Sequence, residues 1–65
     1  MTDDWDDIPI GNPARGALRH AGLAHYEDLT SLTRKQIADL HGIGPKAVRI
    51  LDAELSSRGL AFRPG

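Results

Sequence analysis

The residues best suited to chemistry lie between positions 40 and 48, where two glycines flank an isoleucine and are followed by a proline and a lysine: Leu40-His41-Gly42-Ile43-Gly44-Pro45-Lys46. Glycine adopts positive φ and permits close backbone approach, so this pattern predicts a tight turn between two helices. Pro45 suits the first position of the second helix. The amides of Gly42 and Gly44 and those of the first helical turn would then lack helical partners at the positive end of a helix dipole. The sequence therefore predicts an anion site, with Lys46 beside it.

The same residues also fit a plain helix connector in which Lys46 is simply solvated. Other site chemistries find less support, because the chain has no Cys and its three His are spaced five and sixteen residues apart without a metal-site pattern of carboxylates. Neither a Ser-His-Asp spacing nor a nucleotide-binding Gly-Lys-Ser/Thr loop occurs. We expect no metal and no cofactor.

Helical patterns surround the two glycines. Asn12 and Pro13 predict a helix start, and Gly22 with Leu23 predicts its end. Thr33 and Gln36 form a capping-box pattern, Pro45 opens the last helix and Gly59 closes it; the expected helices cover about 13–21, 25–30, 34–40 and 45–58. No stretch alternates with period two, so we predict an all-α fold, a compact bundle of four to five short helices. Because each is too short to persist alone, stability must come from mutual packing.

Charge divides the chain into two parts. Four of the nine acidic residues lie in residues 1–7, and the rest of the chain carries eight Lys and Arg against five acids, a balance of +3. We predict a flexible acidic tail over residues 1–9, in which Trp5 either packs back or awaits a partner, and one domain over residues 10–65. No apolar run approaches the about 18 residues of a membrane span. The acidic N-terminus is unlike a secretory signal, so a cytoplasmic protein is expected.

At the glycine turn the sequence resembles the helix-hairpin-helix motif of nucleic-acid-binding proteins, through Leu40, Gly42, Ile43, Gly44, Pro45 and Lys46. In that family the turn amides and the lysine hold a DNA phosphate without reading bases. Ala47 departs from the pattern, because a Thr or Ser there often adds a phosphate contact. Residues 12–62 also resemble the C-terminal domain of the bacterial RNA polymerase alpha subunit in the order of their elements. That family's groove-reading Arg and Asn fall here at about Pro13 and Gly16.

Two functions follow as expectations. The first is a small noncatalytic DNA-binding module in bacterial transcription or repair, which binds weakly and largely without sequence preference. Its expected DNA-binding residues share a position at the turn, on the last helix or on the first helix: Asn12, Arg15, Arg19, His41, Gly42, Gly44, Lys46 and Arg49. The alternative is a protein-interaction adaptor on the same scaffold, with no nucleic-acid binding. We expect no catalysis, because Lys46 with Asp52 or Glu54 would need a base pocket that so short a chain cannot build.

Overall fold

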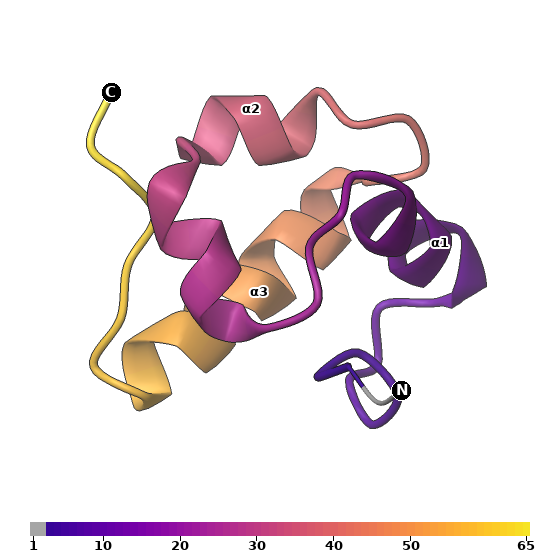
Figure 1. Cartoon of the computed structure of the whole chain (residues 1–65), viewed down its shortest axis with the longest axis horizontal. Coiled ribbons are helices and arrows are strands. Elements are labelled where there is room, and N and C mark those ends of the chain that lie inside the picture. Colours follow the sequence, from indigo (N-terminus) through magenta and orange to yellow (C-terminus); the bar gives the residue numbers. More distant parts are fainter. Residues whose placement is uncertain (1–2) are drawn as a thin grey trace.

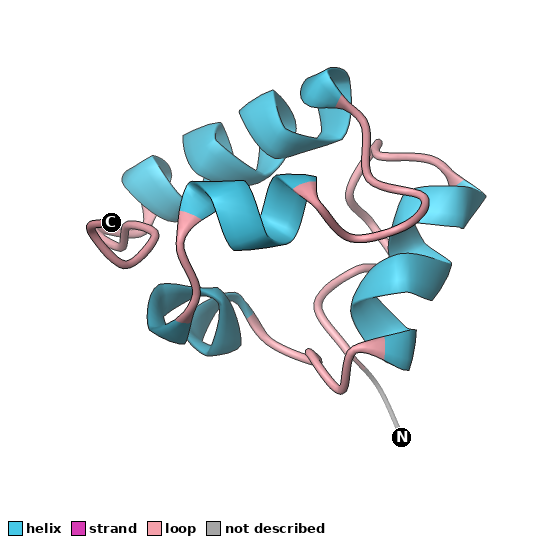
Figure 2. Ribbon diagram, turned by 90° about the horizontal axis from the view of Figure 1, so that it is seen from above, coloured by secondary structure: helices cyan, strands magenta, loops and turns pink. Residues whose placement is uncertain are grey.

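Helices provide the regular structure of residues 3–65, the part of the chain that the computed structural model describes. Their order is α1 (Asn12–His20), the 3₁₀-helix η1 (Tyr26–Ser31), α2 (Arg34–Ala38) and α3 (Pro45–Ser57). Figure 1 shows α3, the longest, running behind the shorter helices, and Figure 2 shows the same arrangement from above. Within these residues backbone pairing between extended segments is limited to one bridge, Thr33 with Arg63. The all-α prediction is confirmed. None of the described helices has the length and apolarity to cross a membrane.

Local signals end and start these helices largely where the sequence predicts. Gly22 has a φ of 78°, and the amide of Leu23 donates to the carbonyl oxygen of Leu18 at 2.9 Å, which closes α1. Gly59 and Leu60 close α3 in the same way. At the start of α2 the capping box is present, because the Thr33 hydroxyl accepts from the amide of Gln36 at 3.1 Å while the Gln36 side chain accepts from the Thr33 amide at 2.8 Å.

The start of α1 differs from the prediction. Asn12 is the first residue of the helix, and Gly11, with a φ of 86°, occupies the capping position. The Asn12 carboxamide makes no cap; its Oδ1 accepts from Nη1 of Arg15 at 2.9 Å. Because Arg15 lies one turn further along the same helix, this bond stabilises the face of α1 on which both residues lie.

The core is assembled from every helix. Its fully buried aliphatic side chains come from α1, η1, α2 and α3: Leu18, Leu29, Ile37, Leu51 and Leu55. Tyr26 of η1 and Val48 of α3 are buried beside them. Such short helices are held together mainly by the burial of apolar surface, which stabilises the fold by about 25 cal/mol per Å².

The N-terminal segment (residues 3–8) differs most from the prediction, which made it part of a flexible tail. Trp5 is fully buried, its ring meets Tyr26 edge to face at 5.1 Å between centroids, and its Nε1 donates to the carbonyl oxygen of Leu23 at 2.7 Å. Ile8 is buried as well. Of the two roles considered for Trp5, packing on the body is the one observed. Residues 1–2 of the predicted tail lie outside the described residues.

Candidate nucleic-acid interface

The glycine turn (residues 41–44) joins α2 to α3 and lies against the first turn of α1. Gly42 has a φ of 98°, and a Cβ added there would lie 2.7 Å from the carbonyl oxygen of Pro13 and 3.4 Å from Cβ of Ala17. Both the backbone conformation and the close approach therefore require glycine at this position. Gly44 has a φ of −103° and open space around it, so its role is different: it caps the N-terminus of α3.

Backbone amides gather at this turn. Ile43 is buried and its amide donates to the carbonyl oxygen of Leu40 at 3.1 Å, which anchors the turn between α2 and α3. The amides of Gly42, Gly44 and Lys46 donate to no acceptor within residues 3–65. Unpartnered amides at the start of a 13-residue helix, together with the dipole of that helix, attract an anion.

The cations next to the glycine turn differ from most others in having no hydrogen-bond or ion-pair partner for their side chains within residues 3–65. Five of the eight Lys and Arg residues bond to a carboxylate or to backbone carbonyls: Arg15, Arg19, Arg34, Lys35 and Arg58. In the part of the chain that the structure describes, no hydrogen bond or ion pair is formed by the side chains of Lys46, Arg49 and Arg63. Lys46 and Arg49 are both exposed and lie in the first turns of α3, next to the glycine turn. The uncompensated positive charge is thus concentrated at the predicted anion site.

Arg15, predicted to face DNA, is engaged with the N-terminal segment instead. Its guanidinium donates to the carbonyl oxygens of Trp5 at 2.8 Å and Ile8 at 2.7 Å and to Oδ1 of Asn12 at 2.9 Å. These bonds fix the path of residues 5–8 across α1. Neither Arg15 nor Asn12 is free to reach a ligand without releasing them.

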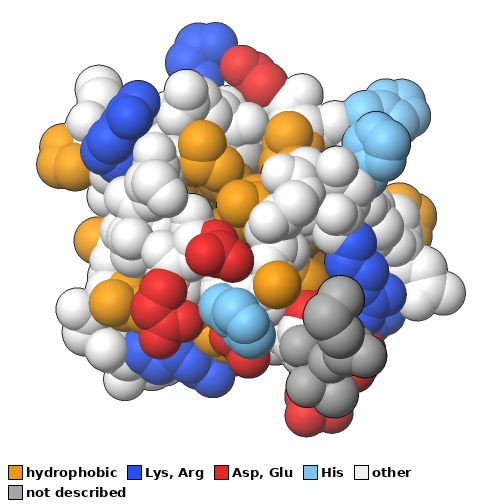
Figure 3. Space-filling model, in the orientation of Figure 1, with side chains coloured by type: hydrophobic (Ala, Val, Ile, Leu, Met, Phe, Trp, Pro, Cys, Tyr) orange, Lys and Arg blue, Asp and Glu red, His pale blue; other side chains and the backbone are white. Residues whose placement is uncertain are grey.

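Arg19 is held by the same segment through charge. Its Nε lies 2.6 Å from Oδ2 of Asp3, and its Nη2 lies 2.7 Å from Oδ1 of Asp6. The hydrogen bond from Arg19 lowers the pKa of the Asp3 carboxyl, and the same bond raises the pKa of the guanidinium. Acidic side chains gather in the lower half of the face drawn in Figure 3, and cations lie beside them. A DNA phosphate would have to replace these carboxylates to reach Arg19.

His41, the last predicted DNA contact, is exposed and lies on the other flank of the turn. Together with His20 it borders an apolar groove of about 590 Å³, whose walls come from α1 and its end and from the glycine turn and the residue before it: Pro13, Gly16, Ala17, Ala21, Leu40 and Gly42. Pro13 and Gly16 are the positions that correspond to the groove-reading residues of the family that the sequence resembles. In this chain they form a shallow apolar surface without a donor side chain.

A second groove was not foreseen from the sequence. It lies between α2 and α3 on the side of Val48, has a volume of about 370 Å³, and is flanked by Arg34 and Arg49. Sequence reasoning missed Arg34 because it stands in the first turn of α2, before the glycine motif, and only packing of α2 on α3 brings it to this groove. The described residues contain no group of three metal-ligating side chains.

Comparisons of this chain with models of protein families, with curated proteins and with solved structures gave no match.

Proposed function

We propose that this domain is a helix-hairpin-helix module that binds the phosphate backbone of duplex DNA through the glycine turn and the first turns of α3. The observation that carries the proposal is the distribution of positive charge: of the three cations that have no side-chain partner within residues 3–65, two, Lys46 and Arg49, lie beside the unpartnered amides of Gly42 and Gly44. Elsewhere on residues 3–65 the positive charge is largely neutralised by neighbouring acids. The resemblance of residues 40–46 to the helix-hairpin-helix motif supports the same conclusion.

Each group has a distinct role in this binding. The Gly44 and Lys46 amides donate to one phosphate at the positive end of α3, and the Lys46 ammonium neutralises it. Arg49 lies three residues later, about one turn along the helix, and bonds to a neighbouring phosphate. These contacts position a duplex and read no base, so the binding is nonspecific.

The number of free cations sets the strength and the salt dependence. With two cations on phosphates, the logarithm of affinity falls with the logarithm of salt concentration at a slope of about −2. The dissociation constant is expected at about 10⁻⁴ to 10⁻⁶ M, as for other nonspecific contacts. A tandem or oligomeric arrangement would raise the effective affinity.

Arg19 can contact DNA only after it releases its carboxylate partners. Its two carboxylate partners, Asp3 and Asp6, compete directly with any phosphate that approaches α1. We therefore expect Asp6→Asn to strengthen duplex binding at low salt by about twofold to threefold, within the range of an exposed ion pair. Unchanged affinity in this variant would place α1 outside the DNA contact and leave the glycine turn as the whole interface.

Titration of ¹⁵N-labelled protein with a short duplex at low salt tests the proposal. We expect the amide shifts to centre on Gly42, Gly44, Lys46 and Arg49, and Lys46→Glu to abolish them. Arg63→Glu is the matched control, because Arg63 is also exposed and unpartnered but lies beside Thr33, at the opposite end of α2 from the turn. The proposal is refuted if the duplex causes no shifts at millimolar concentration, or if Arg63→Glu weakens binding as much as Lys46→Glu.

A further inference from the structure

We propose that the arginine groove, the surface between α2 and α3 lined by Arg34, Ala38, Ile43, Pro45, Val48 and Arg49, binds an acidic peptide segment that carries an apolar anchor residue. This proposal goes beyond DNA binding, because the groove has an apolar floor that a bound phosphate backbone would not cover. Its volume of about 370 Å³ lies near the lower end of the range of sites that hold small ligands.

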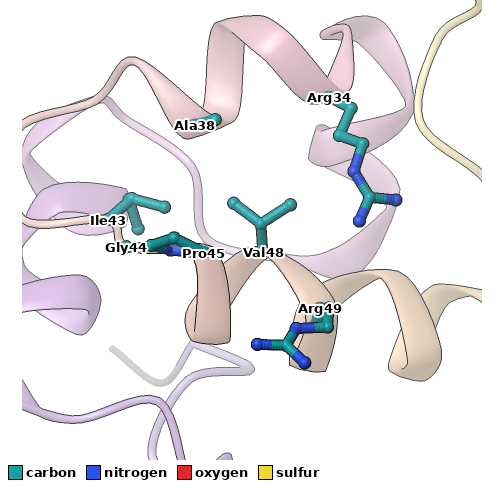
Figure 4. A pocket seen from close by; sticks show the side chains of 7 residues that line it. All are labelled: Arg34, Ala38, Ile43, Gly44, Pro45, Val48 and Arg49. Carbon is teal, nitrogen blue, oxygen red and sulfur yellow. The ribbon is translucent and has the colours of Figure 1, made fainter.

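The floor of the groove is apolar. Val48 and Ile43 are buried and form its base, while Ala38 and Pro45 form exposed walls from α2 and the start of α3. In Figure 4 the methyl groups of Val48 point from α3 toward α2, and Ile43 closes one end. A Leu or Phe side chain placed here would cover apolar surface that water now contacts.

The rim of the groove is cationic. Figure 4 shows the guanidinium of Arg34 extending from α2 toward α3 and that of Arg49 on the α3 side. Among the described residues, no carboxylate lines the groove. Arg49 has no partner within the described residues, and Arg34 has only Asp52, at 2.8 Å in a pair whose two side chains are 52% and 42% exposed. An ion pair so exposed contributes little, so Arg34 can exchange Asp52 for an incoming carboxylate.

The charge of the groove therefore indicates the kind of partner that it binds. Arg34 from α2 and Arg49 from α3 favour a peptide with carboxylates on both sides of its apolar anchor, since Arg binds carboxylates in bidentate geometry. The groove bordered by His20 and His41 is larger, but its lining within residues 3–65 includes no Lys or Arg that would select an acidic partner.

A synthetic peptide tests this directly. The probe is an acetylated and amidated hexapeptide with two Asp before and two Asp after a Leu-Phe pair, titrated into the ¹⁵N-labelled full chain at low salt. We expect shifts at the amides of Ala38 and Val48. Replacing the four Asp by Asn, or the Leu-Phe pair by Ala-Ala, should each weaken binding about tenfold. Equal binding by the Ala-Ala peptide would mean simple charge attraction and would overturn the proposal.

Two variants separate this site from the DNA site, and a third tests the guanidinium that the two sites share. Arg49→Gln, which breaks no side-chain bond within the described residues, should weaken peptide binding about threefold to fivefold and should weaken duplex binding as well. Ala38→Glu places a carboxylate in the exposed wall and should abolish peptide binding while leaving duplex binding within about twofold. Lys46→Ala should do the reverse. The peptide site is refuted if peptide binding survives Ala38→Glu. It is also refuted if a single-stranded oligothymidylate shifts the amides of Ala38 and Val48 and the peptide does not. Neither result bears on DNA binding by the glycine turn.

Discussion

Substitution of Gly42 by alanine tests whether the turn is held in place by its contact with α1. Two effects add: an L-residue at a φ of 98° is strained by about 1–2 kcal/mol, and the new methyl group would lie 2.7 Å from the Pro13 carbonyl oxygen. Relief of that overlap requires α1 and the turn to move apart, as in an overpacked core, at about 1–3 kcal/mol. We expect the free energy of unfolding to fall by about 2–5 kcal/mol, most of what a domain of this size has.

Urea unfolding followed by circular dichroism at 222 nm measures this loss. With a slope of about 1 kcal/mol per M of urea, the midpoint should fall by about 2 M or more. Gly44→Ala is the matched control in the same turn: Gly44 has negative φ and open space, so the poorer cap and the stiffer unfolded chain offset each other to within about 0.5 kcal/mol. Equal stability of the two variants would refute the reasoning.

Three further variants test other contacts by the same urea assay. Trp5→Phe should lower the free energy of unfolding by about 1–3 kcal/mol, because it shrinks a buried ring and leaves the Leu23 carbonyl oxygen without its donor; a loss below about 0.5 kcal/mol would argue against burial. Thr33→Ala should cost about 1 kcal/mol by removing the cap of α2, whereas Thr30→Ala serves as its control, because the Thr30 hydroxyl donates to the Glu27 carbonyl oxygen at 2.7 Å and caps no helix. Asp28 accepts hydrogen bonds from two backbone amides, which lower its pKa below 3.8, so the stability it contributes is present above that pH and is lost as the pH falls below it. Asp28→Asn should therefore reduce the loss of stability between about pH 6 and pH 2.5, and an unchanged loss would contradict this role.

Local chemistry made much of the fold predictable. The cap at Thr33, the positive φ of Gly22 and Gly59, and Pro45 at the start of α3 are each decided within a few residues of chain, so the pattern alone locates them. The turn at Gly42 was likewise predictable from neighbouring residues, because two glycines flank Ile43. Its amides and Lys46 could be grouped as a candidate site because they are consecutive.

Contacts between distant residues were beyond this reasoning. Asp residues around a lone tryptophan have the composition of a solvated tail, and nothing local shows that Trp5 will meet Tyr26 and Leu23. The acceptors of Arg15 are mainly backbone carbonyl oxygens, which no side-chain pattern encodes. The charge of Arg19, predicted as a DNA contact, is evident from the sequence, but its pairing with Asp3 and Asp6 depends on how the N-terminal segment folds back.

The burial of Trp5 gives the domain an internal optical reporter. It is the only tryptophan of the chain and lies fully out of water, so its emission should be blue-shifted in the native state and move to longer wavelength when the N-terminal segment leaves the core. Circular dichroism follows the helices, whereas tryptophan emission follows the segment. Coincident transitions would show that residues 3–8 unfold together with the helices as one cooperative unit. A fluorescence transition at lower urea would instead reveal a segment that detaches first and, in doing so, releases Arg15 and Arg19 on the surface of α1.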